Sequence, residues 1–536
     1  MTARVVRIRP DTYVDSVLLM SATRAMLASP GVDWATAVMA TPANVEALVQ
    51  EGFDKADLDS AGANDLTLAV RADSTGGAET ALHAAAAALE SGGGRPERAP
   101  GQRRPASLAQ ALSVLSGANL ATISVPGPFA ALEAHKAIAA GLNVLLFSDN
   151  VSVADEVGLK AHAAERGVLV MGPGAGTAML GGVGLGFANV VRHATAHDGP
   201  HHEGQNGGAG RGVGIVAAAG TGAQEAMTLL DRAGAEVSHV VGVGGRDLSG
   251  AVGGATARPA IAALEADPHT AAILLVSKPP DPAVAASVLG RGVAKPMVAV
   301  LVGLGRTDFE TNVAVGEGIR LARTIDEGVA LTASGLGLPA TGHPSGQVEA
   351  AEVAGGRLGP GRPAVRGLFS GGTLCSESMA VLSRRLGAVY SNVPLEPEWG
   401  LPAPPGAHRC LDLGEEEYTK GRPHPMIDPE ARLELLSSQG DDPDVAVVLL
   451  DVVLGHGAHD DPAGRLAPAC AEIHAGGRGP VVVAYVLGTD HDPQGLDSQR
   501  ATLTEAGALV APTGARAALA AAALATRRPE LVDHRL

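Results

Sequence analysis

Two glycine-threonine turns, each between an apolar run and a helical stretch, recur along this chain. The first segment, Gly212–Met227, reads GVGIVAAAGTGAQEAM, and the second, Ala364–Met379, reads AVRGLFSGGTLCSESM. Their Gly-Thr pairs lie 152 residues apart, and Glu225 and Glu377 keep the same offset. An apolar run, a small-residue turn and a helix are typical of a parallel α/β unit. The chain is therefore predicted to contain two copies of such a unit.

The correspondence continues downstream of both turns. Asp267-Pro268 precedes AAILLVSK, and Asp442-Pro443 precedes AVVLLDVV, 175 residues later. Pro296 and Pro480 open two further apolar strands at an offset of 184 residues. An offset that grows along the chain indicates loop insertions in the second copy.

Composition excludes several classes of function. A formal net charge of −17, with six lysines in 536 residues, disfavours nucleic-acid binding, which needs clustered basic side chains. The three cysteines have no CxxC spacing, so neither a disulfide framework nor a metal site is expected. No signal core and no apolar run of about 18 residues is present, so we expect a cytoplasmic protein that does not contact membranes.

Linker-like stretches divide the chain. SGGGRPERAPGQRRP (91–105) and VRHATAHDGPHHEGQNGGAGR (191–211) are rich in Gly, Pro and polar residues. His193, His197, His201 and His202 in the second stretch are interpreted as solvated linker residues rather than metal ligands. The predicted domains are a small α/β domain (1–92), a Rossmann-like domain (108–190) and two flavodoxin-like domains (212–333 and 364–536).

Within this frame the predicted fold class is α/β, with several doubly wound parallel sheets. Strands are expected at 121–125, 144–147 and 168–171, alternating with helices at 129–140 and 154–166. Ligands of such sheets bind at the carboxyl ends of the strands.

Longer motifs carry a resemblance to a known family. They are VMATPAN (38–44), FSDNV (147–151), GGRDLS (244–249), VSKPP (276–280), SGGTL (370–374) and GRPHPMIDP (421–429). In this order they resemble the FdrA family of acyl-CoA-synthetase-like proteins, within the succinyl-CoA synthetase superfamily. The resemblance implies a CoA-binding-type domain, two ligase-type domains and a subunit of oxamate carbamoyltransferase. That enzyme works with two companion subunits in allantoin breakdown, converting oxalurate and phosphate to oxamate and carbamoyl phosphate.

The sequence also departs from the ligase pattern. The superfamily phosphorylates a histidine in a Gly-His-Ala-Gly loop, but the corresponding segment 303–320 contains no histidine. Gly174-Ala175 and Ala219 stand where relatives tend to have polar residues. No cofactor is required by carbamoyl transfer, and binding of CoA or a nucleotide is left as an open alternative.

The candidate site residues combine these motifs with the expected strand ends. The candidate phosphate- or substrate-binding residues are Gly220, Thr221, Gly222, Gly371, Gly372, Thr373, Asp247, Ser148 and Asn150. The candidate catalytic residues are Lys278, Arg246, His424 and Arg422. Backbone N–H groups at a helix N-terminus bind anions, although each turn could be an ordinary strand-to-helix connection.

Each side chain has a structural alternative. Arg246 offers a bidentate fork for a carboxylate or phosphate, or it forms a structural pair with Asp247. Lys278 ends an apolar strand as a ligand or as a solvated lysine. The loop with His424 and Arg422 supplies an acid or base, or it shapes an interface. Cys375 is interpreted as a buried structural thiol.

Three functions are consistent with these features. The first is a carbamoyltransferase subunit that binds small anionic substrates and assembles with companion subunits as an oligomer. The alternatives are a CoA ligase and a non-catalytic subunit that binds a metabolite and regulates its partners.

Overall fold

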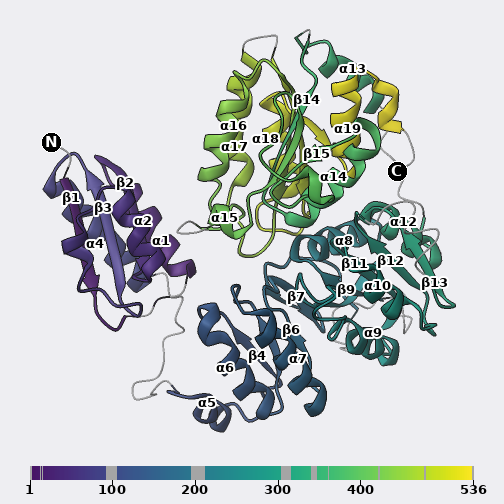
Figure 1. The fold of residues 1–536 in the computed structure, drawn as a ribbon, viewed down its shortest axis with the longest axis horizontal. Helices are drawn as coiled ribbons and strands as arrows, with labels where there is room; N and C mark the ends of the chain where they lie inside the picture. Colours follow the sequence, from purple (N-terminus) through teal and green to yellow (C-terminus); the bar gives the residue numbers. More distant parts are fainter. Residues whose placement is uncertain are drawn as a thin grey trace, which may run out of the picture. The chain divides into compact units, whose positions relative to one another are not determined.

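The computed structural model describes residues 3–12, 14, 16–91, 105–194, 212–303, 315–339, 347–359, 361–419, 423–475 and 479–533. Contacts divide the chain into two units, Met1–Ser107 with Glu416–Pro423, and Leu108–Glu415 with His424–Leu536 (Figure 1).

The N-terminal unit is an antiparallel sheet of order β1-β3-β2 with helices packed against it. Its elements are β1 (Ala3–Arg9), α1 (Ser16–Leu27), β2 (Val32–Met39), α2 (Pro42–Gln50), α3 (Lys55–Leu58), β3 (Leu66–Ala72) and α4 (Thr75–Ser91). The central strand is mostly apolar, and Leu66, Leu68 and Val70 pack with Met26 of α1 and Leu82 of α4. The helix α15 (Glu416–Thr419) belongs to the same unit.

The second unit begins with a three-stranded parallel sheet of order β4-β5-β6. Its elements are α5 (Leu108–Val114), β4 (Leu120–Ile123), α6 (Gly127–Ala139), β5 (Asn143–Leu146), α7 (Val153–Arg166) and β6 (Val170–Met171). Strands and helices alternate here as the sequence predicts.

The first repeat carries five parallel strands in the order β13-β12-β11-β9-β10. Its elements are β9 (Gly212–Ala218), α8 (Gly220–Arg232), β10 (Glu236–Gly242), α9 (Ala257–Ala266), β11 (Thr270–Ser277), α10 (Pro282–Leu289), β12 (Met297–Leu301), β13 (Ile319–Ala322) and α12 (Ile325–Gly335). The hairpin of β7 (Thr177–Leu180) and β8 (Val183–Gly186) extends this sheet antiparallel to β10. These two strands lie in the segment predicted as the Rossmann-like domain, but their hydrogen bonds are with the next sheet.

The second repeat has a similar parallel sheet of six strands, in the order β15-β16-β14-β17-β18-β19. Its elements, after α13 (Gln347–Gly355), are β14 (Ala364–Phe369), α14 (Gly372–Leu386), β15 (Val389–Tyr390), η1 (Pro397–Trp399), β16 (His408–Asp412), α16 (Glu430–Gln439), β17 (Val445–Val453), α17 (Pro462–Ala475), β18 (Val481–Leu487), α18 (Leu496–Glu505), β19 (Leu509–Ala511), α19 (Gly514–Thr526) and η2 (Pro529–Asp533). In both repeats the first strand is internal: β9 lies between β10 and β11, and β14 lies between β16 and β17, with β15 at the edge beside β16. An internal first strand is typical of flavodoxin-like sheets.

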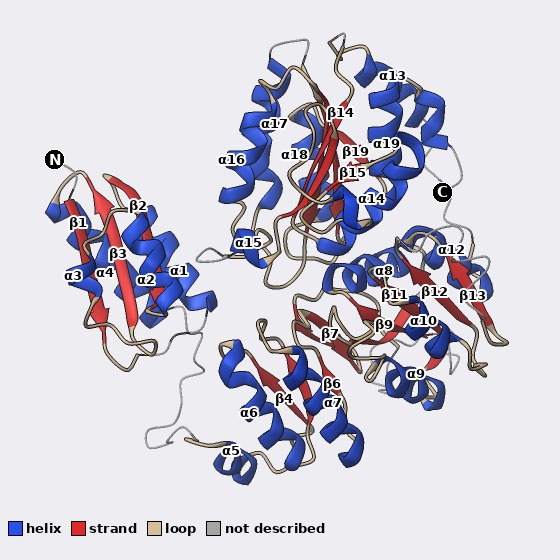
Figure 2. Ribbon diagram, viewed as in Figure 1, coloured by secondary structure: helices blue, strands red, loops and turns tan. Residues whose placement is uncertain are grey.

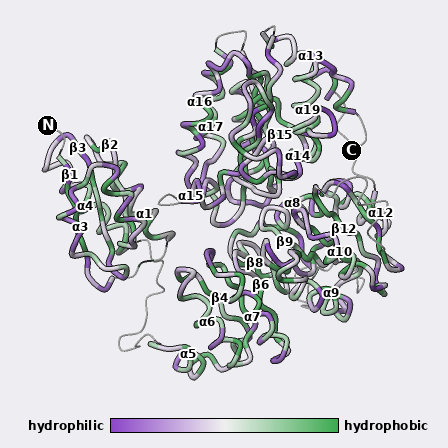
Figure 3. Tube along the Cα trace, in the orientation of Figure 1, coloured by the Kyte–Doolittle hydropathy of each residue, from purple (hydrophilic) through white to green (hydrophobic). Residues whose placement is uncertain are grey.

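The first strand of each repeat is buried along its whole length because helices cover both faces of the sheet (Figure 2). Such strands are continuously apolar rather than alternating, and the hydropathy of the chain shows this at the sheet centres (Figure 3). Each first strand leads into its helix, α8 or α14, through the glycine-threonine turn. The fold class is therefore α/β with several parallel sheets, as predicted.

Candidate functional site

The two glycine-threonine turns meet at the contact between the repeats. The backbone N–H of Thr373 donates to Oγ1 of Thr221 at 3.3 Å. A Cβ on Gly222 would lie 2.9 Å from Cγ2 of Thr373, and a Cβ on Gly371 would lie 2.9 Å from Cγ2 of Thr221. The glycines therefore allow two helix N-termini, which are 152 residues apart in the sequence, to lie against each other.

Neither helix N-terminus is capped by a side chain. The residues that precede α8 and α14 are Ala219 and Gly371, and neither position provides a side-chain hydrogen bond. Thr373 is 1% exposed, and its hydroxyl has no hydrogen-bond partner among the described residues. An unpaired buried hydroxyl is costly, and it lies here beside N–H groups that favour an anion.

Lys278 extends from the first repeat to the turn of the second. It follows β11, and its Nζ lies 3.7 Å from Asp412 and 3.6 Å from Glu415. A Cβ on Gly372 would lie 2.6 Å from this Nζ and 2.3 Å from Oδ2 of Asp412. The structure therefore brings Lys278 together with Gly371, Gly372 and Thr373.

Asp412 was not predicted as a site residue; it ends strand β16, in which it and the two preceding residues are buried. It is 2% exposed, and burial raises its pKa to about 6 while the charge of Lys278 opposes this rise. The side chain of Asn392 hydrogen-bonds to both backbone groups of Asp412. It accepts from the N–H at 3.0 Å and donates to the carbonyl oxygen at 2.9 Å.

A second buried aspartate supports the same turn. Asp451 accepts from the N–H groups of Ser370 at 2.8 Å and Gly371 at 2.7 Å. Its carboxylate also pairs with the buried Arg432 at 3.1 Å. A lone carboxylate in the apolar strand VAVVLLDVV was the sequence signal that could have identified Asp451.

His424 lies in the second repeat, whereas Arg422 lies outside the described residues. The ring of His424 is 6.5 Å from that of Phe187, and its Nδ1 accepts from the N–H of Met426 at 3.2 Å. Burial lowers the pKa of His424 to about 4. The imidazole is therefore neutral near pH 7 and a weak base, with its Nδ1 already accepting a hydrogen bond.

Arg246 and Asp247 belong to a different cluster. Arg246 Nε lies 2.9 Å from Glu156, and Lys160 Nζ lies 2.7 Å from Asp247 and 2.8 Å from Glu156. Asp247 also accepts from the backbone at the start of α9. These contacts join helix α7 to the first repeat, and the ion pair of Arg246 is with Glu156 rather than with Asp247.

Ser148 and Asn150 form the turn after β5. Ser148 donates to the carbonyl of Ile123 at 3.4 Å, and Asn150 has a φ of 58°. A Cβ on Gly127 would lie 2.4 Å from the Asn150 carbonyl oxygen, so α6 begins against this turn. Gly220 has a more open position, where a Cβ would be 3.7 Å from Thr177 Oγ1.

Two buried glutamates connect the repeats reciprocally. Glu225 of α8 accepts from Tyr485 Oη at 2.5 Å and from the N–H of Gly514, at the start of α19, at 3.5 Å. Glu377 of α14 accepts from the N–H of Ile325, at the start of α12, at 2.6 Å. Each repeat thus places a carboxylate at a helix N-terminus of the other repeat. The common offset of the two glutamates was visible in the sequence, but their partners were not.

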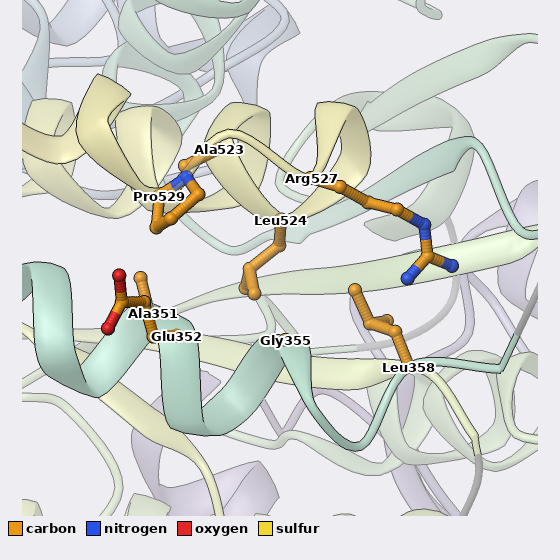
Figure 4. A pocket seen from close by; sticks show the side chains of 8 residues that line it. All are labelled: Ala351, Glu352, Gly355, Leu358, Ala523, Leu524, Arg527 and Pro529. Atoms are coloured by element: carbon orange, nitrogen blue, oxygen red, sulfur yellow. The ribbon is translucent and has the colours of Figure 1, made fainter.

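A cavity of about 210 Å³ lies elsewhere, between α13, α19 and η2 (Figure 4). Its lining is Ala351, Glu352, Gly355, Leu358, Ala523, Leu524, Arg527 and Pro529. None of these residues belongs to the opposed turns, so the cavity is separate from the candidate anion site.

The described part of the chain contains no group of three or more His, Cys, Asp or Glu placed to hold a metal ion. His197, His201 and His202 lie outside it. No helix in the same part is sufficiently long and apolar to cross a bilayer.

Comparisons with known proteins match most of the chain. The CoA-ligase family matches residues 368–524, and a family described as AllF, heavy metal-associated domain, matches residues 1–105. The uncharacterised protein YahF of Escherichia coli K12 is 38% identical over 532 residues, covering 97% of this chain and 98% of YahF.

Two solved structures are similar at lower identity. The apo form of dinucleotide-forming acetyl-coenzyme A synthetase 1 from Ca. Korarchaeum cryptofilum is 15% identical, with a TM-score of 0.28 over 77% of this chain and 84% of that chain. ATP citrate lyase from Methanothrix soehngenii is 17% identical, with a TM-score of 0.28 over 43% of this chain and 37% of that chain. Because both TM-scores are low, the fold of this chain is assigned from its own sheets alone.

The heavy-metal name of the N-terminal family can be tested against the residues present. Residues 1–105 contain no cysteine and one histidine, His83. Soft metals are held by thiolate or thioether ligands in clusters. The residues of this segment do not fit a thiolate metal site.

Proposed function

The chain belongs to the FdrA family of acyl-CoA-synthetase-like proteins, in the succinyl-CoA synthetase superfamily, and on that premise we propose that it is a carbamoyltransferase subunit. The proposed reaction transfers the carbamoyl group of oxalurate to phosphate, which gives oxamate and carbamoyl phosphate. The observation that carries this proposal is the pair of opposed, uncapped helix N-termini with the unpaired Thr373 hydroxyl between them.

In this proposal phosphate binds where the two turns meet. The N–H groups at the start of α8 and the hydroxyl of Thr373 donate to its oxygens, together with those N–H groups of α14 that are not already bonded to Asp451 or Thr221. Lys278 adds a positive charge at the same turn, where negative charge grows on the tetrahedral intermediate. Thr221 and Thr373 are buried, so hydrogen bonds at the turns are stronger than in water, while Lys278 is partly exposed.

Carbamoyl transfer by this route requires no cofactor of the chain itself. Phosphate is the nucleophile and the amide of oxamate is the leaving group. We propose that companion subunits complete the site, as the resemblance implies, and that the assembly is an oligomer.

A CoA-ligase reaction is the second candidate, favoured by the family match at residues 368–524. Against it, segment 303–320 has no histidine to carry a phosphoryl group. Incubation with labelled ATP distinguishes the two, because a ligase of this superfamily becomes labelled and a phosphate-dependent carbamoyltransferase does not.

The direct test is reconstitution of the full chain with its companion subunits, followed by an assay for carbamoyl phosphate made from oxalurate and inorganic phosphate. Formation of carbamoyl phosphate that depends on all subunits supports the proposal. Absence of product, with phosphorylated protein after ATP treatment, contradicts it and supports the ligase.

The phosphate site has a matched pair of variants. Thr67 and Thr373 are both buried threonines with unpaired hydroxyls, but Thr67 lies in β3 of the N-terminal unit. Thr373→Val should weaken binding of inorganic phosphate about 10- to 100-fold, the effect of one hydrogen bond to a charged group. Thr67→Val should leave phosphate binding unchanged. Titration calorimetry with the full chain measures both, and equal affinities in the two variants would contradict the assignment.

A further inference from the structure

Two buried aspartates flank the first residues of α14, in different surroundings. Asp451 is neutralised by Arg432 and accepts the N–H groups of Ser370 and Gly371. Asp412 has a weaker set of partners. Its Oδ1 accepts from the N–H of Gly414 at 3.0 Å, and its Oδ2 lies 3.7 Å from Lys278 Nζ, beyond hydrogen-bond length.

Asp412 is held rigidly at the carboxyl edge of the sheet. Asn392 fixes its backbone through both the N–H and the carbonyl. Its Oδ2 lies against the Cα of Gly372, where a Cβ would be 2.3 Å away. The carboxyl group therefore faces the turn at which the proposed phosphate binds.

We propose that Asp412 is the general acid that protonates the amide leaving group in this site, an inference that rests on the proposed function. A ureide donor has the form R–CO–NH–CO–NH₂. Attack by a phosphate oxygen forms the O–C bond to the carbamoyl carbon, and the bond between this carbon and the acylated nitrogen breaks. An amide anion is a poor leaving group, so the nitrogen must take a proton as the bond breaks.

The protons balance within the two substrates. Asp412 in its carboxylic acid form gives its proton to the leaving nitrogen, which releases the free amide R–CO–NH₂. The resulting carboxylate takes the proton that hydrogen phosphate carried and returns to the acid form. Carbamoyl phosphate leaves as the dianion, and no further reactant is needed.

The charges around Asp412 suit this role. Burial, the neighbouring carboxylate of Glu415 and that of Asp451 raise the pKa of Asp412, and the ammonium of Lys278 opposes them. Cys375 of α14 and His424, whose Nε2 lies beside Gly414 as Asp412 Oδ1 does, are further titratable neighbours. With a pKa of about 6, Asp412 is protonated in a minority of the protein molecules at neutral pH. Two carboxylates at one site with different surroundings are the usual arrangement for an acid and a fixed charge.

The test compares Asp412→Asn with wild type in the reconstituted complex. Phosphate affinity of the full chain should not weaken, because the amide removes a negative charge beside the site, while the rate of carbamoyl phosphate formation should fall about 100-fold or more. Wild-type activity should decrease as the pH rises through the pKa of the acid, and Asp412→Asn should lose this dependence. Asp460→Asn, an exposed aspartate of the second repeat, is the control and should match wild type.

A second variant covers the case in which Asp412→Asn does not fold. Lys278→Met removes the charge that lowers the pKa of Asp412, so the decrease in activity should move to higher pH. A wild-type rate and pH profile in Asp412→Asn would overturn the inference, as would an unmoved profile in Lys278→Met. An inactive wild-type complex would instead refute the proposed function itself.

Discussion

Gly372 shows how a single residue sets the geometry of the candidate site. Its backbone conformation does not require glycine, because its φ is not in the left-handed region. The lack of space does require glycine, because Lys278 and Asp412 occupy the position that a Cβ would take. Glycine is therefore required here because a lysine from one repeat contacts the first turn of a helix in the other repeat.

Gly372→Ala is therefore expected to displace Lys278 and Asp412. The added methyl group should lower the free energy of unfolding by about 1–3 kcal/mol and weaken phosphate binding. Urea denaturation and phosphate titration of the full chain measure the two effects.

Gly158→Ala is the control for this substitution. Gly158 lies inside α7, and a Cβ there would meet nothing within 4 Å. It should be as stable as wild type or more stable by up to about 1 kcal/mol, because alanine favours helix. Equal behaviour of the two variants would show that the space at Gly372 is not restrictive.

At the scale of elements, α8 and α14 act as a pair. Each begins at a glycine-threonine turn, and each carries a glutamate four residues after the threonine. Glu225 reaches the start of α19 and Glu377 reaches the start of α12. A carboxylate at a helix N-terminus is favourable, so these exchanged contacts fix how the two repeats meet.

The raised pKa values of Glu225 and Glu377 predict that the stability of the fold depends on pH. Burial raises the pKa of Glu225 from its ordinary value of 4.5 to about 7, and burial with the charges of Asp326 and Glu225 raises the pKa of Glu377 well above its ordinary value. The folded state therefore binds protons that the unfolded state releases. The stability contributed by protonated Glu225 is complete below about pH 4.5 and is lost as the pH rises through about 7.

Glu225→Gln should remove most of the pH dependence of stability that Glu225 causes. The amide has the size of the protonated carboxyl group but does not titrate. Differential scanning calorimetry between pH 5 and 8 should show a smaller fall of Tm than in wild type. Glu165→Gln, an exposed position of α7, should retain the wild-type slope. An unchanged slope in Glu225→Gln would contradict the raised pKa.

At the scale of the second unit, residues 187–190 connect the Rossmann-like part to both repeats. Asn189 donates to Leu454 O at 2.9 Å and to Asp492 at 2.8 Å, and it accepts from Gln224 at 3.1 Å. Asp492 also accepts from the N–H groups of Val190 and Thr489, each at 2.8 Å. This buried carboxylate therefore satisfies three donors from two segments 300 residues apart in the sequence.

Asp492→Ala should leave these donors unpaired and lower the free energy of unfolding by about 2–4 kcal/mol. The transition in urea should also broaden or split, because the repeats lose a shared contact. Asp490→Ala, an exposed neighbour in the same loop, should have little effect. Equal stability of both variants would exclude the contact as a connection between the parts.

Local patterns were sufficient for the elements but not for their partners. Apolar runs and turns predicted β9, β14 and the helices after them because strand and helix signals are local in sequence. Arg246 and Lys278 looked equivalent, as polar residues at strand ends. The fold separates them, since Arg246 pairs with Glu156 whereas Lys278 lies at Gly372.

The sequence by itself determined that the chain has two copies of one α/β unit, each with a glycine-threonine turn at a helix N-terminus. Only the tertiary structure decided that the two turns face each other, and that Lys278 and Asp412 lie at the same place. The physical reason is that a helix start is specified by neighbouring residues, whereas the contact of Thr221 with Thr373 depends on how two buried surfaces pack. No local pattern encodes that packing.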